Sequence, residues 1–85
     1  GIKFHITLDS WVIVLTSKRI LCAVVEKYEA KWQVMLVSIT RIKKLDEGLE
    51  IYYVNSKTPG FQQDRVEITG KPEQLTTLYD VLRNL

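Results

Sequence analysis

The chain has 85 residues, and its 12 Lys or Arg against 10 Asp or Glu give a formal net charge of +2. Hydrophobic residues make up 46% and charged residues 26%, a globular composition that excludes collagen, coiled-coil and disordered classes. The apolar runs, such as residues 11–15, are far shorter than the roughly 18 residues that a membrane-spanning helix needs. We therefore expect a single soluble domain over residues 1–85.

A single cysteine, Cys22, lies within an apolar run and has no partner for an internal disulfide. This position predicts a buried, unreactive thiol, and one cysteine is typical of a cytosolic or nuclear protein. The chain begins at Gly1 rather than Met and has no secretory signal pattern. We therefore expect a domain cut from a longer protein.

Alternation of apolar and polar residues, together with β-branched and aromatic content, predicts six to seven short strands. In chain order, the expected strands are 2–8, 11–16, 20–25, 31–37, a short strand after a bend within 38–45, 49–53 and 61–69. The short polar segments 9–10, 17–18 and 46–48 predict tight turns, so consecutive strands should pair in antiparallel fashion.

After Gly70 the apolar period changes from two to about 3.6, which predicts one amphipathic helix. Pro72 suits the first helical position, and Glu73 complements the helix N-terminus. The expected apolar stripe is Leu75, Leu78, Tyr79, Leu82 and Leu85. The predicted fold is mainly β with one α-helix: a barrel of six to seven antiparallel strands capped by the C-terminal helix.

Two segments carry a resemblance to known domains. Residues 14–21, VLTSKRIL, resemble a hairpin of pleckstrin-homology-like (PH-like) and GRAM-type domains, and residues 31–42, KWQVMLVSITRI, resemble the Trp-led strand and paired isoleucines that follow it. With the leucine-rich helix, the chain is most similar to the C-terminal PH-like domain of chorein-family (vacuolar protein sorting) bridge-like lipid-transfer proteins. Ser38 stands where that family's strand usually ends in Asp.

The resemblance implies a PH-like barrel that is cytoplasmic and peripheral at organelle membranes or membrane contact sites. It also implies a membrane-associated protein partner, with Arf-type small GTPases as the first class. Phosphoinositide-binding relatives usually hold the head group with basic residues near the first loop. Here that loop is Asp9 and Ser10, so we do not expect tight phosphoinositide binding.

The residues do not assemble a recognisable catalytic, metal or nucleotide motif. His5 is the only histidine, and one His with one Cys cannot supply a zinc shell. The four glycines are isolated in different segments, unlike a phosphate-binding loop. A net charge of +2 gives little attraction for nucleic acid. We expect no enzymatic activity, no metal, no cofactor and no nucleic-acid partner.

Two small basic clusters are candidate contacts for anionic lipid. Their members are Lys18 and Arg19 in one predicted turn, and Arg41, Lys43 and Lys44 beside the fifth predicted strand. Each basic residue near an anionic membrane contributes on the order of 1 kcal/mol of binding free energy. The alternative is that these side chains are solvated, with Arg19 paired to a carboxylate on a neighbouring strand.

The second and third predicted strands are apolar on both faces, which a half-exposed sheet does not need. Val12, Val14 and Leu21 lie on the second face and are candidate partner-binding residues, with Tyr52 and Phe61 as possible extensions. The alternative is that other elements of the domain cover this face.

The sequence therefore leads to one main functional hypothesis and two alternatives. The first is a non-catalytic adaptor or targeting module that docks a lipid-transfer protein to an organelle by binding a membrane-associated protein. The alternatives are weak direct binding to anionic lipid or phosphoinositide membranes, and a structural domain packed against its own parent protein.

Overall fold

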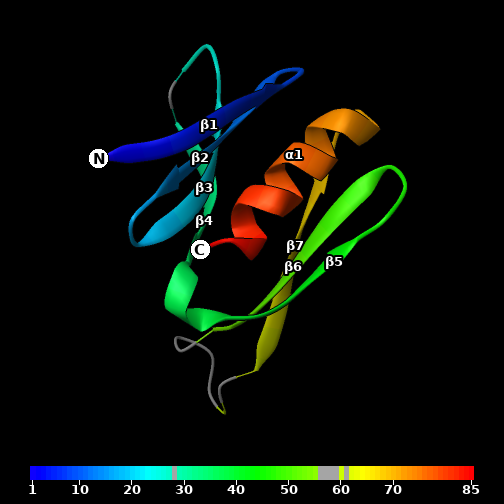
Figure 1. Ribbon diagram of the computed structural model, residues 1–85. Helices are drawn as coiled ribbons and strands as arrows, with labels where there is room; N and C mark the ends of the chain where they lie inside the picture. The colour runs from blue at the N-terminus through cyan, green and yellow to red at the C-terminus, as the bar shows by residue number, and fades with distance from the viewer. Residues whose placement is uncertain (28, 56–59, 61) are drawn as a thin grey trace. The chain divides into compact units, whose positions relative to one another are not determined.

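A computed structural model describes residues 1–27, 29–55, 60 and 62–85 (Figure 1). Within these ranges the chain forms seven strands, a short 3-10 helix and one α-helix. In order they are β1 (Ile2–Leu8), β2 (Trp11–Thr16), β3 (Arg19–Val24), β4 (Ala30–Met35), η1 (Leu36–Ser38), β5 (Ile39–Lys44), β6 (Gly48–Val54), β7 (Gln63–Thr69) and α1 (Pro72–Arg83). The mainly-β class with one C-terminal helix is thus confirmed.

The strands pair as two antiparallel sheets, one in the order β1-β2-β3-β4 and one in the order β5-β6-β7. The chain divides into two compact units, residues 1–37 and 38–85, and each unit contains one sheet. The barrel that the sequence predicts is therefore not closed by hydrogen bonds between the described strands. Two antiparallel sheets and a C-terminal helix are compatible with the PH-like fold.

Local chemistry explains the two tight turns of the first sheet. Asp9 adopts a φ of 59°, a left-handed conformation that Asp tolerates better than most residues. In the β2–β3 turn, the Thr16 hydroxyl accepts hydrogen bonds from the backbone N–H groups of Lys18 (3.3 Å) and Arg19 (3.1 Å). It also donates to the Arg19 carbonyl at 3.2 Å, so one side chain organises the whole turn.

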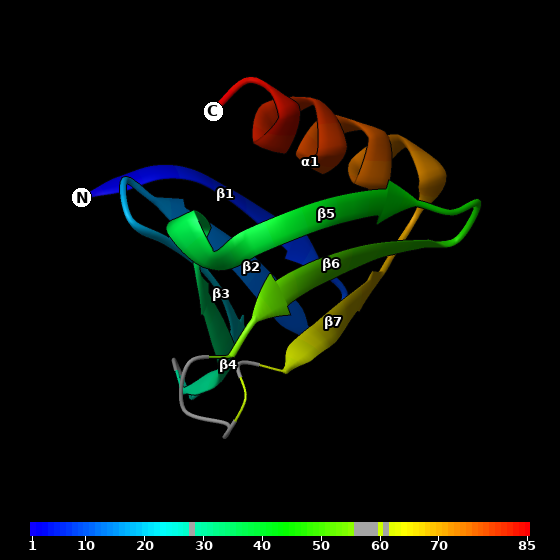
Figure 2. The ribbon, with the colours of Figure 1, turned by 90° about the horizontal axis from the view of Figure 1, so that it is seen from below.

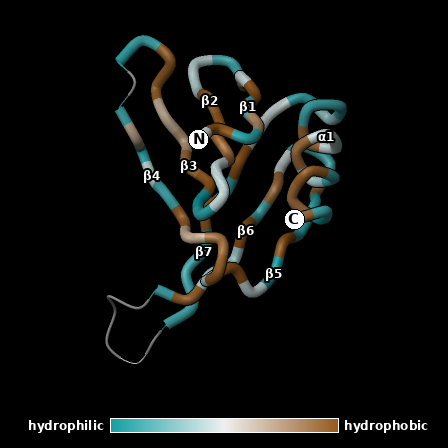
Figure 3. The backbone as a smooth tube through the Cα atoms, turned by 60° about the vertical axis from the view of Figure 1, so that its left-hand side comes forward, coloured by the Kyte–Doolittle hydropathy of each residue, from teal (hydrophilic) through white to brown (hydrophobic). Residues whose placement is uncertain are grey.

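One face of the first sheet is buried. Its strand register places apolar side chains opposite one another, as with Ile13 and Cys22, and Leu15 and Ile20. The buried residues on this face are Leu8, Ile13, Leu15, Ile20, Cys22 and Val34. Apolar colour along β2 and β3 shows how the core of this unit follows the two central strands (Figure 3).

The core of the second unit lies between its sheet and its helix. Helix α1 lies against β5 and β6 (Figure 2). The buried side chains are Leu49 and Ile51 on β6, Ile68 on β7, and Leu75, Leu78 and Leu82 on the helix. The sequence correctly predicts that the three helix leucines are buried. Leu85 lies beyond the helix end and is 62% exposed, so the apolar stripe ends at Leu82.

Two predicted strand boundaries differ from the structure by two residues, whereas the others agree to within one residue. The strand expected over 31–37 ends at Met35, where the chain enters η1 and supplies the predicted bend before β5. The strand expected over 61–69 is observed from Gln63 onward, and Phe61 lies outside the described residues.

Candidate docking surface

The second face of the β2–β3 hairpin carries a continuous set of small aliphatic side chains. Cross-strand pairing sets Val14 opposite Leu21 and Val12 opposite Ala23. Val12, Val14 and Leu21 are only partly buried, whereas Ala23 is buried. These four residues are the aliphatic strip. The hairpin thus presents partly accessible apolar area on a rigid sheet rather than on a loop.

Polar residues border the aliphatic strip on both neighbouring strands. On β1, His5 pairs with Val14 and Thr7 pairs with Val12. On β4, Gln33 pairs with Leu21. An apolar centre with a polar rim is the usual anatomy of a protein–protein interface. The strip therefore has the composition expected of a small docking surface.

The first predicted basic pair, Lys18 and Arg19, lies at the β2–β3 turn, and both side chains are exposed. The Arg19 guanidinium donates a hydrogen bond from Nη1 to Oε1 of Gln33 at 3.1 Å. The alternative considered from the sequence was a carboxylate partner for Arg19. The observed partner is a neutral amide, so this hydrogen bond leaves the positive charge of Arg19 uncompensated.

The second predicted basic cluster lies in the other unit, on β5. Arg41 and Lys43 share a face of the sheet, because they pair with Tyr52 and Glu50 of the central strand. Lys44 follows directly and therefore points to the opposite face. The Arg41 guanidinium lies 5.9 Å from the centroid of the Tyr52 ring. The strand thus separates Lys44 from the two residues with which the sequence groups it.

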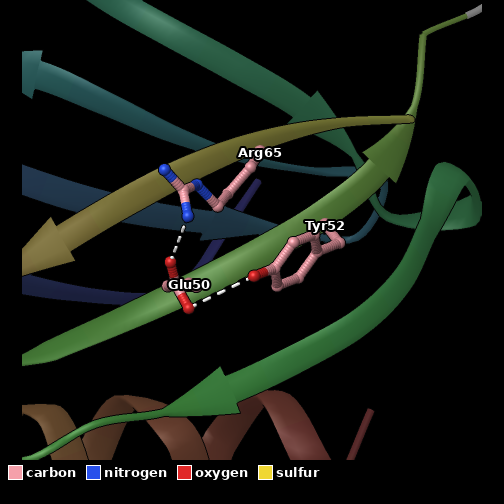
Figure 4. Close-up of polar contacts among 3 residues, drawn as sticks. All are labelled: Glu50, Tyr52 and Arg65. Atoms are coloured by element: carbon pink, nitrogen blue, oxygen red, sulfur yellow. Dashed lines mark hydrogen bonds and ion pairs between the residues drawn. The ribbon is translucent and has the colours of Figure 1, made fainter. Parts of the chain in front are cut away.

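Tyr52, a predicted apolar contact, takes part in a polar cluster of the second sheet (Figure 4). Its hydroxyl donates to Oε1 of Glu50 at 3.3 Å. Arg65 of β7 places Nη1 2.7 Å from Oε2 of the same carboxylate. Glu50 is only 7% exposed, although its side chain is charged. Because β6 belongs to the second sheet, Tyr52 lies on a different sheet from Val12, Val14 and Leu21.

The Glu50 cluster also affects the protonation of Arg65. The Tyr52 hydroxyl and, next, the Glu50 carboxylate raise the pKa of Arg65 above its ordinary value. The guanidinium therefore keeps its charge throughout the accessible pH range. Sequence reasoning missed this cluster because Glu50 and Arg65 are far apart in the chain and only the β6–β7 register brings them together. The one available signal was a Glu within an otherwise apolar strand.

Near the end of the first sheet that is opposite the β2–β3 turn, the positive charge of Lys31 acts on Cys22. A register shift between Cys22 and Ala23 accompanies the placement of Lys31, whose Nζ lies 4.1 Å from the centroid of the Trp11 ring. Burial raises the pKa of the Cys22 thiol, and the positive charge of Lys31 opposes that effect. Cys22 is free and buried, as the sequence predicts.

The described residues hold no group of three His, Cys, Asp or Glu side chains that suits a metal ion. Among the helices in those same ranges, none is long and apolar enough to cross a membrane. The chain matches no protein-family model, no curated protein and no solved structure. Interpretation of its function therefore depends on the surfaces that its own residues form.

Proposed function

We propose that this chain is a non-catalytic docking module that attaches a chorein-type lipid-transfer protein to an organelle membrane. Its partner is a membrane-associated protein, with an Arf-type small GTPase as the first candidate. The single observation that carries the proposal is the aliphatic strip, which lies partly accessible between polar borders. The resemblance of residues 14–21 and 31–42 to PH-like domains supports the parent protein and the partner class.

The strip is suited to bind a protein because its backbone is already ordered. The central strands β2 and β3 each pair on both sides, so binding does not have to order a loop. Removal of apolar surface from water is favourable by about 25 cal/mol per Å², and part of this gain offsets the entropy that the two partners lose on association. A strip of four small side chains supplies only part of an interface, and the polar border supplies orientation.

Flotation of the chain with vesicles that carry a GTP-loaded Arf-type GTPase tests this proposal. We expect recruitment by the GTPase, and about tenfold weaker recruitment of Val14→Thr, which keeps the β-branched shape but places a hydroxyl in the apolar centre. Val14→Asp should abolish it. Leu45→Thr is the control, because Leu45 is an exposed aliphatic residue of the other unit and lies outside both the aliphatic strip and its polar border.

Circular dichroism of each variant separates loss of binding from loss of folding. Undiminished recruitment of a folded Val14→Asp variant would overturn the proposal, as would equal recruitment with and without the GTPase.

A further inference from the structure

We infer that one end of the first sheet is a contact site for an anionic lipid bilayer. This surface differs from the aliphatic strip, and the inference does not rest on the docking of a protein there. It combines three exposed apolar and three exposed basic side chains, which form the sheet-end patch. They are Ile2, Met35, Val37, Lys3, Lys18 and Arg19.

The β2–β3 turn and the end of β4 meet at this patch (Figure 1). The backbone N–H of Leu36 donates to the carbonyl of Lys18 at 2.9 Å. Arg19 pairs with Met35 across β3 and β4. Val37 follows Leu36 directly, so it also lies next to the basic turn. Two cations and two exposed apolar side chains are thus held together by backbone pairing.

The start of β1 completes the patch. Ile2 pairs with Thr16, the residue that organises the β2–β3 turn, and Lys3 lies at the register shift that follows. The apolar members are unusually accessible: Val37 is 94%, Ile2 66% and Met35 44% exposed. A bilayer that covered these side chains would be stabilised against dissociation, because each apolar side chain gains free energy on leaving water.

The acidic residues of the first sheet are confined to the end that is opposite the sheet-end patch, where Lys27 and Lys31 also lie. The acidic residues of segment 1–37 are Asp9, Glu26 and Glu29, and all of them lie at the opposite end of the sheet. A hydrogen bond of 3.2 Å from the N–H of Val25 to the carbonyl of Ser10 joins the two connections that carry them. The sheet-end patch therefore presents positive charge together with apolar side chains.

This combination favours a bilayer over other anionic partners. Basic side chains bind anionic head groups, while exposed apolar side chains enter the boundary between head groups and acyl chains. Nucleic acid would use the charges but gain little from the apolar residues. Either signal alone binds membranes weakly, so their coincidence on one rigid end matters.

The basic residues on β5 are less suited to this role. Lys43 lies opposite Glu50, which in turn pairs with Glu67, so carboxylates lie on the same sheet face as Lys43. Lys44 points to the other face. These residues therefore make a good control, because they carry the same kind of charge without exposed apolar neighbours on the same strand.

Flotation of the full chain with vesicles, without any GTPase, tests the inference. One set of vesicles contains phosphatidylcholine alone, and the other also contains phosphatidylserine. We expect binding only to the anionic set. Lys18→Glu combined with Arg19→Glu should weaken it at least about tenfold, since each cation near an anionic surface strengthens binding roughly fivefold. Val37→Ser should weaken it roughly fivefold.

Lys43→Glu combined with Lys44→Glu is the matched control, with the same change in net charge. If this control weakens binding as much as reversal at Lys18 and Arg19, net charge explains the binding and the assignment to the sheet end is wrong. Equal binding to both vesicle sets would also overturn the inference. A Val37→Ser variant that binds normally would contradict the apolar contact. Failure of these tests leaves GTPase-dependent recruitment through the aliphatic strip unaffected.

Discussion

Glu50 and Arg65 form an ion pair between the central and edge strands of the second sheet, with 2.7 Å between Oε2 and Nη1. The two partners differ in environment, since the side chain of Glu50 is 9% exposed and that of Arg65 is 53% exposed. The sheet therefore holds one carboxylate away from water and relies on Arg65 and Tyr52 to satisfy it.

Removal of the guanidinium should destabilise the second unit. Arg65→Met keeps much of the side-chain stem but leaves the Glu50 carboxylate without its cation. We expect a lower midpoint of chemical unfolding, and partial recovery when Glu50→Gln removes the unpaired charge. A double-mutant cycle by urea unfolding measures this coupling. Additive effects of the two substitutions would contradict the pairing.

The core and the sheet-end patch should respond very differently to truncation. Ile20 is fully buried, so Ile20→Ala should lower the free energy of unfolding by about 2–5 kcal/mol. Val37 is 94% exposed, so Val37→Ala should change it by less than about 0.5 kcal/mol. Urea unfolding of both variants measures the difference. A large loss at Val37 would show that it packs against the rest of the chain.

Much of the fold was predictable because its signals are local. Period-two alternation locates the strands, and the change of period after Gly70 locates the helix. The failures lie where the backbone changes direction. Residues 36–38 have strand-like composition but form η1, because the chain leaves the sheet there. Leu85 has the correct helical spacing, yet the helix ends at Arg83 before it can be buried.

The candidate surfaces were only partly predictable, because they depend on register. Alternation correctly places Val12 and Val14 on one face, but pairing decides that His5 and Gln33 border them. The exposure of Val37 has no sequence signal at all. A valine within an apolar run is normally expected to be buried. Val37 is exposed because it lies in η1, beyond the end of β4.

The β1–β2 turn should be sensitive to side-chain shape. Asp9 has a φ of 59°, where β-branched residues are strained. Asp9→Val should lower the free energy of unfolding by about 1–2 kcal/mol. Asp9→Gly, which adopts this conformation without strain, should be neutral within about 0.5 kcal/mol. Thermal or urea unfolding distinguishes the two, and equal losses would indicate that the Asp9 carboxylate rather than its backbone matters.

Cys22 should make stability fall at alkaline pH. Burial raises the pKa of its thiol above the ordinary value of 9.0, with Lys31 opposing the shift. Well below pH 9.0 the thiol is protonated in both the folded and the unfolded state, so the full stability is present. As the pH rises further, the unfolded chain loses this proton first, and stability falls by up to about 1.4 kcal/mol per pH unit.

Cys22→Ala isolates this effect from the titration of lysines and tyrosines. The difference in unfolding free energy between the two proteins should be constant up to the ordinary thiol pKa and then shrink as the pH rises. Lys31→Gln should leave the onset of this decline unchanged but make the total loss larger, because it removes the charge that favours the thiolate in the folded protein and so raises the folded-state pKa further. A difference that grows with pH would mean that the folded protein stabilises the thiolate, and Cys22 would then be a reactive rather than a structural cysteine.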